Sequence, residues 1–155
     1  MRLEEAIKQT VPFASPQRKA LVNLLFTANQ VSADMKRLFK SHGLTMKQYN
    51  ILRILNGASR PVCLAFIRER LLDRLSDVSR ILDRMENGGL IVKTPSNMDK
   101  RLVDVQLSDK GSAMLEEVSA HQEELDAFMG PLTDADVEEL NRLLDKIRSE
   151  STLTT

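Results

Sequence analysis

The sequence predicts a mainly α-helical fold with one small antiparallel β-hairpin. Most of the 155 residues show the three- and four-residue apolar spacing of amphipathic helices, interrupted by short polar turns. The segment from residue 90 to residue 107 has a different texture, because β-branched residues alternate there with polar ones on both sides of a turn-rich loop. A chain of this length with 42% hydrophobic residues can fill one core, so we expect a single domain over residues 1–155.

Two helices are expected at the start of the chain. Ser15-Pro16 is typical of a helix start, since the serine can cap free amides and proline fits the first helical position. Gly43 is placed to end this long helix in a left-handed conformation. Thr45, with Gln48 three residues later, forms the pattern of a capping box that opens the second helix, and Gly57 is expected to end it.

Two shorter helices and a hairpin follow in direct succession. The helices are expected over Val62–Leu72 and Ser76–Asn87, with Ser76 as the cap of the second one. The hairpin strands are expected over Leu90–Thr94 and Leu102–Leu107. A helix pair alone is weak evidence, but a hairpin directly after it is the order of a winged helix-turn-helix, whose second helix reads the major groove. We therefore expect residues 44–111 to form a winged helix-turn-helix lobe.

Two further helices are expected after the hairpin. Ser108 is placed to cap a long helix that runs towards Phe128 and Met129, and Gly130-Pro131 ends it. Thr133, with Asp136 three residues later, opens the last helix. Together with the first helix, these helices carry more apolar surface than one small winged domain could cover. Residues 1–43 and 112–148 are therefore expected to be the dimerisation helices of a homodimer.

Charge is segregated along the chain although the net charge is zero. Residues 1–59 carry nine Lys/Arg and three Asp/Glu, residues 60–111 carry ten and eight, and residues 112–155 carry three and eleven. The chain can therefore present a positive face to DNA while an acidic C-terminal segment points elsewhere.

The sequence argues against an enzyme, a metalloprotein and a membrane protein. The single cysteine, Cys63, and two histidines provide no zinc-type ligand set, and we find no nucleophile elbow or phosphate-binding loop. We expect no metal or other cofactor. No apolar run approaches the roughly 18 residues of a membrane span, and the first residues lack an apolar signal core, so we expect a cytoplasmic protein.

The second helix of the pair has two distinct faces. A rotation of about 100° per residue gathers its apolar residues on one buried stripe, formed by Val78, Ile81, Leu82 and Met85. The residues expected to contact DNA are Ser76, Asp77, Ser79, Arg80 and Arg84 on this helix, with Lys100 and Arg101 in the wing loop. An alternative interpretation of Asp77, Asp83 and Arg84 is a solvated face with local ion pairs. For the two acids this alternative is favoured, because carboxylates and phosphates repel each other. The alternative for the wing loop is an ordinary charged hairpin tip.

The stretch Leu75–Gly111, LSDVSRILDRMENGGLIVKTPSNMDKRLVDVQLSDKG, resembles the MarR family (multiple antibiotic resistance regulators). The similarity covers the recognition helix, the glycine entry into the first wing strand, the wing's Asp-x-Arg and the V-x-L-S exit. By this resemblance Asp99 and Arg101 take the positions of the family's wing pair, with Asp99 positioning the arginine. The resemblance also implies a homodimer that places two recognition helices in successive major grooves of a pseudo-palindromic operator.

The resemblance further implies a small-molecule effector. Many members of that family release DNA when a small phenolic or anionic compound enters a cleft between the dimer helices and the DNA-binding lobe. Our candidates for lining such a cleft lie where the first two helices meet: His42, Met46, Tyr49 and Arg53. The alternative is that Met46 belongs to the core and that His42 and Tyr49 are half-buried boundary residues. Because other members of that family sense oxidants through a cysteine, redox sensing by Cys63 is a further alternative, against the usual packing of a free cysteine as a small hydrophobic residue.

These expectations combine into a sequence-specific, double-stranded DNA-binding transcriptional regulator, a repressor that a small-molecule ligand relieves. The alternative is a helical dimerisation or scaffold protein whose winged lobe binds another protein. Salt dependence separates the two, because only DNA binding releases condensed counterions.

Overall fold

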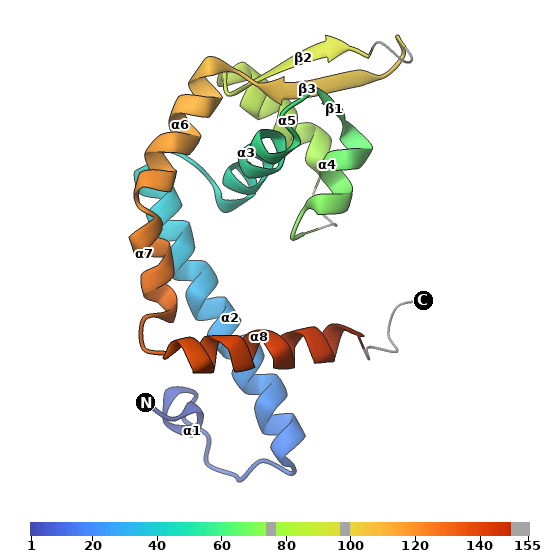
Figure 1. The fold of residues 1–155 in the computed structure, drawn as a ribbon. Helices are drawn as coiled ribbons and strands as arrows, with labels where there is room; N and C mark the ends of the chain where they lie inside the picture. The colour runs from blue at the N-terminus through green and yellow to red at the C-terminus, as the bar shows by residue number, and fades with distance from the viewer. Residues whose placement is uncertain (74–76, 97–99, 150–155) are drawn as a thin grey trace. The chain divides into compact units, whose positions relative to one another are not determined.

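The computed structural model describes residues 1–73, 77–96 and 100–149. These residues pack into two compact units, Met1–Val118 and the segment from Ser119 onward. Among the described helices, none is long and apolar enough to cross a membrane. The first unit contains α1 (Leu3–Ala6), α2 (Pro16–Ser41), α3 (Met46–Ala58), β1 (Val62–Cys63), α4 (Leu64–Arg70), α5 (Val78–Asn87), β2 (Ile91–Pro95), β3 (Val103–Leu107) and most of α6 (Asp109–Ala120) (Figure 1). The second contains α7 (Gln122–Asp126), a 3₁₀ turn (Ala127–Met129) and α8 (Asp134–Ser149).

The first long helix begins and ends where the sequence predicts. The hydroxyl of Ser15 accepts a hydrogen bond from the Arg18 amide at 3.2 Å, and Pro16 occupies the first helical position. Gly43 follows the end of α2 with a φ of +70°, so the expected left-handed stop is confirmed. The short helix α1 was not expected. It is held by the buried Leu3 and by an ion pair of 2.6 Å between Glu4 and Lys19, which also holds the pKa of Glu4 below its usual value.

Helix α3 has the predicted start but a different end. Thr45 and Gln48 form the expected capping box, with the Thr45 amide donating to Gln48 Oε1 at 2.9 Å. The prediction that Gly57 ends the helix is wrong, because Gly57 stays helical. The left-handed residue is Ser59, with a φ of 52°, and its amide and hydroxyl both donate to the Asn56 carbonyl.

The predicted helix Val62–Leu72 is too long at both ends. Its first two residues form β1, which pairs antiparallel with β3 through Val62↔Val105 and Cys63↔Asp104. The sheet therefore has three strands in the order β1-β3-β2. A two-residue strand has no periodicity of its own, and it forms because β3 offers an unpaired edge on the side away from β2. The helix itself is confined to α4, Leu64–Arg70.

The predicted hairpin is confirmed. Strands β2 and β3 pair from Ile91↔Leu107 to Pro95↔Val103, and beyond the last pair the Ser96 amide donates to the Leu102 carbonyl at 2.9 Å. This hairpin is the wing. The middle of its tip, which includes Asp99, lies outside the described residues.

The helix after the wing is shorter than predicted. The Ser108 hydroxyl accepts from the Gly111 amide at 2.9 Å, which confirms the expected cap of α6. The expectation of one helix reaching Phe128 and Met129 is wrong, because the helix is interrupted at His121, whose φ of −96° and ψ of 26° are not helical. The His121 carbonyl accepts from the Glu124 amide, which starts a separate turn. Helix α8 begins at the predicted Thr133–Asp136 box.

The core of the first unit lies between the sheet and α3, α4 and α5, which pack against it (Figure 1). Its members are apolar and essentially inaccessible to solvent: Ile51, Leu52, Ile67, Val78, Met85 and Val105. Burial of each large side chain contributes about 1.5–3 kcal/mol to the free energy of folding, so this cluster holds α5 and the wing in a fixed relative position.

Candidate nucleic-acid interface

The start of α5 is capped one residue later than predicted. The carboxylate of Asp77 accepts from the Arg80 amide at 3.2 Å, and the helix begins at Val78. The prediction that Ser76 is the cap is therefore wrong, and Ser76 itself lies outside the described residues. Asp77 also approaches the Arg80 guanidinium at 3.9 Å, a loose and exposed ion pair.

The two predicted faces of α5 are present. Val78, Leu82 and Met85 are buried, and Ile81 is half-buried beside them. The expected DNA-contacting residues on this helix that can be described are all exposed: Asp77, Ser79, Arg80 and Arg84. The buried stripe therefore prevents rotation of the helix and keeps one polar face directed outward.

Two acidic residues of α5 form ion pairs with the wing. Lys93, in the middle of β2, lies 2.5 Å from a carboxylate oxygen of Asp83 and 3.0 Å from one of Glu86. The hydrogen bond to Asp83 raises the pKa of Lys93 above its ordinary 10.5, and Glu86 adds to this while partial burial opposes it. The interpretation of Asp83 as a member of a local ion pair is confirmed.

Lys93 was not among the residues expected at the interface. The signal was available in the alternation of β2, because Lys93 shares the face of Ile91, which is 2% exposed. A charged residue on a core-facing strand position requires a partner.

The wing cations lie beyond the paired part of the hairpin. Lys100 and Arg101 are both exposed and are separated from the start of β3 by Leu102 alone. Strand pairing of β2 and β3 ends at Pro95↔Val103, so these two side chains belong to the loop end that extends from the sheet.

A small pocket lies where α5 meets the wing. It has a volume of about 220 Å³ and is lined by Leu64, Ser79, Leu82, Asp83, Lys93, Val103 and Val105. Its lining is largely apolar, while the Lys93 ion pairs supply its polar groups. At this place α5 and the wing are joined by ion pairs as well as by apolar packing.

The effector candidates lie around the end of α2 and the first half of α3. His42 follows α2, and its Nδ1 lies 3.5 Å from a carboxylate oxygen of Glu117 on α6. The Tyr49 ring stacks on Phe39, with ring centroids 4.6 Å apart. Met46 is half-buried and Arg53 is exposed. The structure therefore gathers His42 and Tyr49 near one helix junction, and a ligand role for these four residues stays a prediction.

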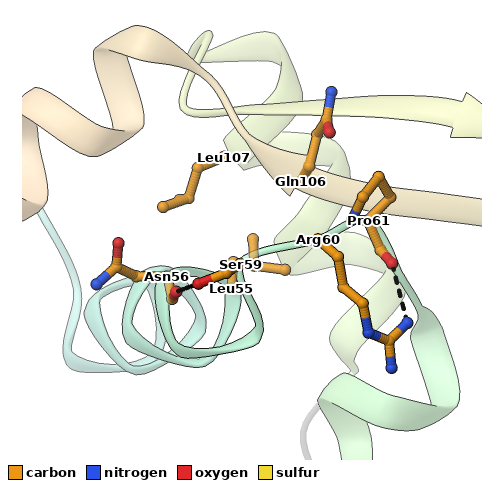
Figure 2. A pocket seen from close by; sticks show the side chains of 7 residues that line it. All are labelled: Leu55, Asn56, Ser59, Arg60, Pro61, Gln106 and Leu107. Atoms are coloured by element: carbon orange, nitrogen blue, oxygen red, sulfur yellow. Dashed lines mark hydrogen bonds between the residues drawn. The ribbon is translucent and has the colours of Figure 1, made fainter.

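A second pocket, of about 240 Å³, lies at the opposite end of α3 (Figure 2). It is lined by Leu55, Asn56, Ser59, Arg60, Pro61, Gln106 and Leu107. Figure 2 shows the Arg60 side chain extending past Pro61, whose carbonyl accepts from Arg60 Nη1 at 3.4 Å. None of the effector candidates lines this pocket.

Comparison with known proteins identifies the family. The sequence profile described as "MarR family" matches residues 42–102. The chain is 35% identical over 111 residues to the HTH-type transcriptional regulator MgrA of Staphylococcus aureus, covering 72% of this chain and 74% of the relative. The chain belongs to the MarR family. Another relative, the HTH-type transcriptional repressor IacR of Pseudomonas putida, is 31% identical over 116 residues, or 74% of this chain and 68% of that one.

Solved structures of transcriptional regulators share the fold. The organohalide-sensing regulator RdhR in its 2,4-dichlorophenol-bound form superposes with a TM-score of 0.80 at 23% identity, over 92% of this chain and 88% of that one. AbsC, a MarR-family regulator of Streptomyces coelicolor, gives 0.76 at 20% identity, over 90% and 97%. BpsR of Bordetella bronchiseptica, whose DNA binding is regulated by 6-hydroxynicotinic acid, gives 0.72 at 21% identity, over 84% and 98%. The protein is a MarR-family transcriptional regulator, and its relatives are not enzymes.

Proposed function

We propose that this regulator binds double-stranded DNA sequence-specifically, with α5 in the major groove and the wing over the adjacent minor groove. The observation that carries the proposal is the orientation of α5. Val78, Leu82 and Met85 hold one side of the helix in the core, so Arg80 and its polar neighbours face outward beside the wing. An exposed, oriented helix followed by a hairpin is the arrangement that enters a major groove.

Each candidate residue has a role that fits its chemistry. Arg80 is the candidate for bidentate recognition of a guanine, while Ser79 and Arg84 contact base edges or phosphates. Asp77 acts by capping α5 and so holds the Arg80 backbone in place. Lys100 and Arg101 enter the minor groove, where negative potential is concentrated. Ser76 and Asp99, which lie outside the described residues, keep the DNA-contacting and wing-positioning roles that the sequence suggests.

Replacing Arg80 by alanine is expected to change sequence preference more than general affinity. Loss of a bidentate base contact costs about 1–3 kcal/mol of discrimination, whereas binding to random duplexes depends mainly on phosphate contacts. Fluorescence anisotropy on the chain's own upstream DNA and on a scrambled duplex measures both. Arg37→Ala, which removes an exposed arginine of α2 paired with Asp34, is the control. Equal losses on both duplexes would reduce Arg80 to a phosphate contact.

We further propose that the DNA-binding form is a homodimer. Apolar side chains remain exposed in the single chain on both long terminal helices. They include Leu21 (58%) and Leu25 (56%) on α2, and Leu143 (43%) and Ile147 (58%) on α8. A second chain that covers these residues would also place two copies of α5 about one helical turn of DNA apart. The arrangement requires two chains per operator duplex, and a complex with one chain would contradict it.

We also propose that this DNA binding represses transcription and that a small phenolic or anionic aromatic compound relieves the repression. RdhR was solved with 2,4-dichlorophenol, and 6-hydroxynicotinic acid regulates DNA binding by BpsR. In this chain His42, Tyr49, Met46 and Arg53 offer an imidazole, a phenol ring, a thioether and a guanidinium around one helix junction. A ligand anion would compete with Glu117 for His42.

The effector proposal is tested with those two compounds as probes. We expect at least one of them to weaken binding to the operator duplex by about tenfold or more, a coupling of the size usual for allosteric regulators. The variant His42→Ala should lower the response while leaving the ligand-free affinity within about twofold, a difference below 0.5 kcal/mol. No response to either probe up to millimolar concentration would count against this class of effector.

A further inference from the structure

The recognition helix carries two carboxylates as well as its arginines. Asp83 and Glu86 both lie on α5, with side chains 63% and 43% exposed. Uncompensated carboxylates on an element that enters a DNA groove would repel the phosphates on both sides. The arginines of α5 alone therefore do not explain how this helix could approach DNA, because the two carboxylates oppose their attraction for phosphate.

Lys93 compensates both of these charges from the neighbouring wing strand. Its Nζ lies 2.5 Å from Asp83 and 3.0 Å from Glu86, and its side chain is only 19% exposed. The three residues come from α5 and β2, two elements that contact each other and that each bury an apolar residue nearby, Leu82 on α5 and Ile91 on β2. The ion pairs are therefore held in place by the fold, and the ammonium carries its charge throughout the physiological pH range.

We propose that Lys93 masks Asp83 and Glu86 and thereby permits the recognition helix to approach DNA. The inference rests on the proposed DNA binding and adds a residue that need not touch DNA. Its low exposure and two carboxylate partners make Lys93 a poor phosphate ligand, because a phosphate would have to displace both of them. Partly exposed ion pairs contribute little to stability, so the effect on DNA binding is expected to exceed the effect on folding.

The test compares a variant that lacks the Lys93 charge with variants that also lack the carboxylate charges of Asp83 and Glu86. Lys93→Met removes the ammonium with similar side-chain length and is expected to weaken binding to specific and random duplexes by about tenfold at low salt. Adding Asp83→Asn and Glu86→Gln to that variant removes the unmasked charges and should restore affinity to within about threefold of the wild type. Lys93→Arg keeps the charge and should bind like the wild type.

The salt dependence supplies a second readout. Repulsion by two unmasked carboxylates is screened over a Debye length of about 10 Å at 0.1 M salt, so the deficit of Lys93→Met should shrink as salt rises. A purely structural effect would instead persist at all salt concentrations and would appear as a loss of thermal stability. The double variant Asp83→Asn/Glu86→Gln, which keeps Lys93, should bind random DNA more tightly than the wild type.

Several outcomes would overturn the inference while leaving the proposed function intact. If wild-type protein binds DNA and the triple variant is as weak as Lys93→Met, Lys93 contacts phosphate directly or acts only by shaping the fold. If Lys93→Met does not fold, a loss of affinity in Asp83→Asn/Glu86→Gln would also contradict masking. Failure of the wild type to bind any duplex would instead overturn the proposed function itself.

Discussion

Replacing Gly111 by alanine is expected to lower the free energy of unfolding by about 3 kcal/mol, the upper end of overpacking costs. Gly111 lies in the first turn of α6, where the helix meets the chain just before β2. A Cβ at this position would stand 2.0 Å from the Leu90 carbonyl oxygen and 3.0 Å from its carbon. Both are backbone atoms. A shift of Leu90 away from the new Cβ is opposed by the hydrogen bond that its carbonyl accepts from the Ser108 amide.

Urea denaturation measures this effect, and Gly57→Ala is the matched control. Gly57 is also helical, but a Cβ added there would meet no atom of the described residues within 4 Å outside its own stretch of helix. Alanine there should stabilise the protein by about 0.5–1 kcal/mol, since glycine is the poorer helix former. Equal denaturation midpoints for the two variants would show that the Leu90 backbone leaves room for a Cβ at position 111, contrary to the close contact between α6 and Leu90.

Replacing Arg101 by alanine is expected to weaken binding to all duplexes by about 1–3 kcal/mol, the usual worth of a charge-assisted contact to DNA. Arg101 is exposed at the loop end of the wing, beyond the last strand pair, so little change in folding stability is expected. Because the minor groove attracts an arginine through its potential, the loss should be similar on specific and random DNA. This pattern is the opposite of the one expected for Arg80.

Anisotropy titrations on both duplexes, with thermal melting alongside, separate binding from folding. Arg37→Ala again serves as the control, since Arg37 is an exposed arginine paired with Asp34 outside the winged lobe. Wild-type affinity in Arg101→Ala would show that the wing arginine makes no contact with DNA. A loss confined to the specific duplex would mean that Arg101 reads bases.

The parts of the fold that depend on local sequence could be predicted. Ser15, Thr45, Ser108 and Thr133 all act at helix starts as expected, because a cap is determined by residues within three positions of it. The same holds for the left-handed stop at Gly43. The orientation of α5 followed from a 3.6-residue apolar repeat that the core then buries.

The features that depend on tertiary contacts could not be predicted in this way. Strand β1 exists only because β3 has an open edge for Val62 and Cys63. The cap of α5 is Asp77 and not the predicted Ser76, because both residues can cap a helix and the local sequence pattern does not decide between adjacent candidates. The pairing of Lys93 with Asp83 and Glu86 depends on how a helix and a strand cross, which no spacing in the sequence encodes.

The central claim, sequence-specific DNA binding by α5 and the wing, is tested most directly by titrating wild-type protein onto its own upstream duplex over a series of salt concentrations. We predict two chains per duplex and an affinity at least about 10³-fold above that for a scrambled duplex. We also predict a linear fall of log affinity with log salt as phosphate-bound counterions are released. Equal affinity for both duplexes, or binding that does not respond to salt, would contradict the claim.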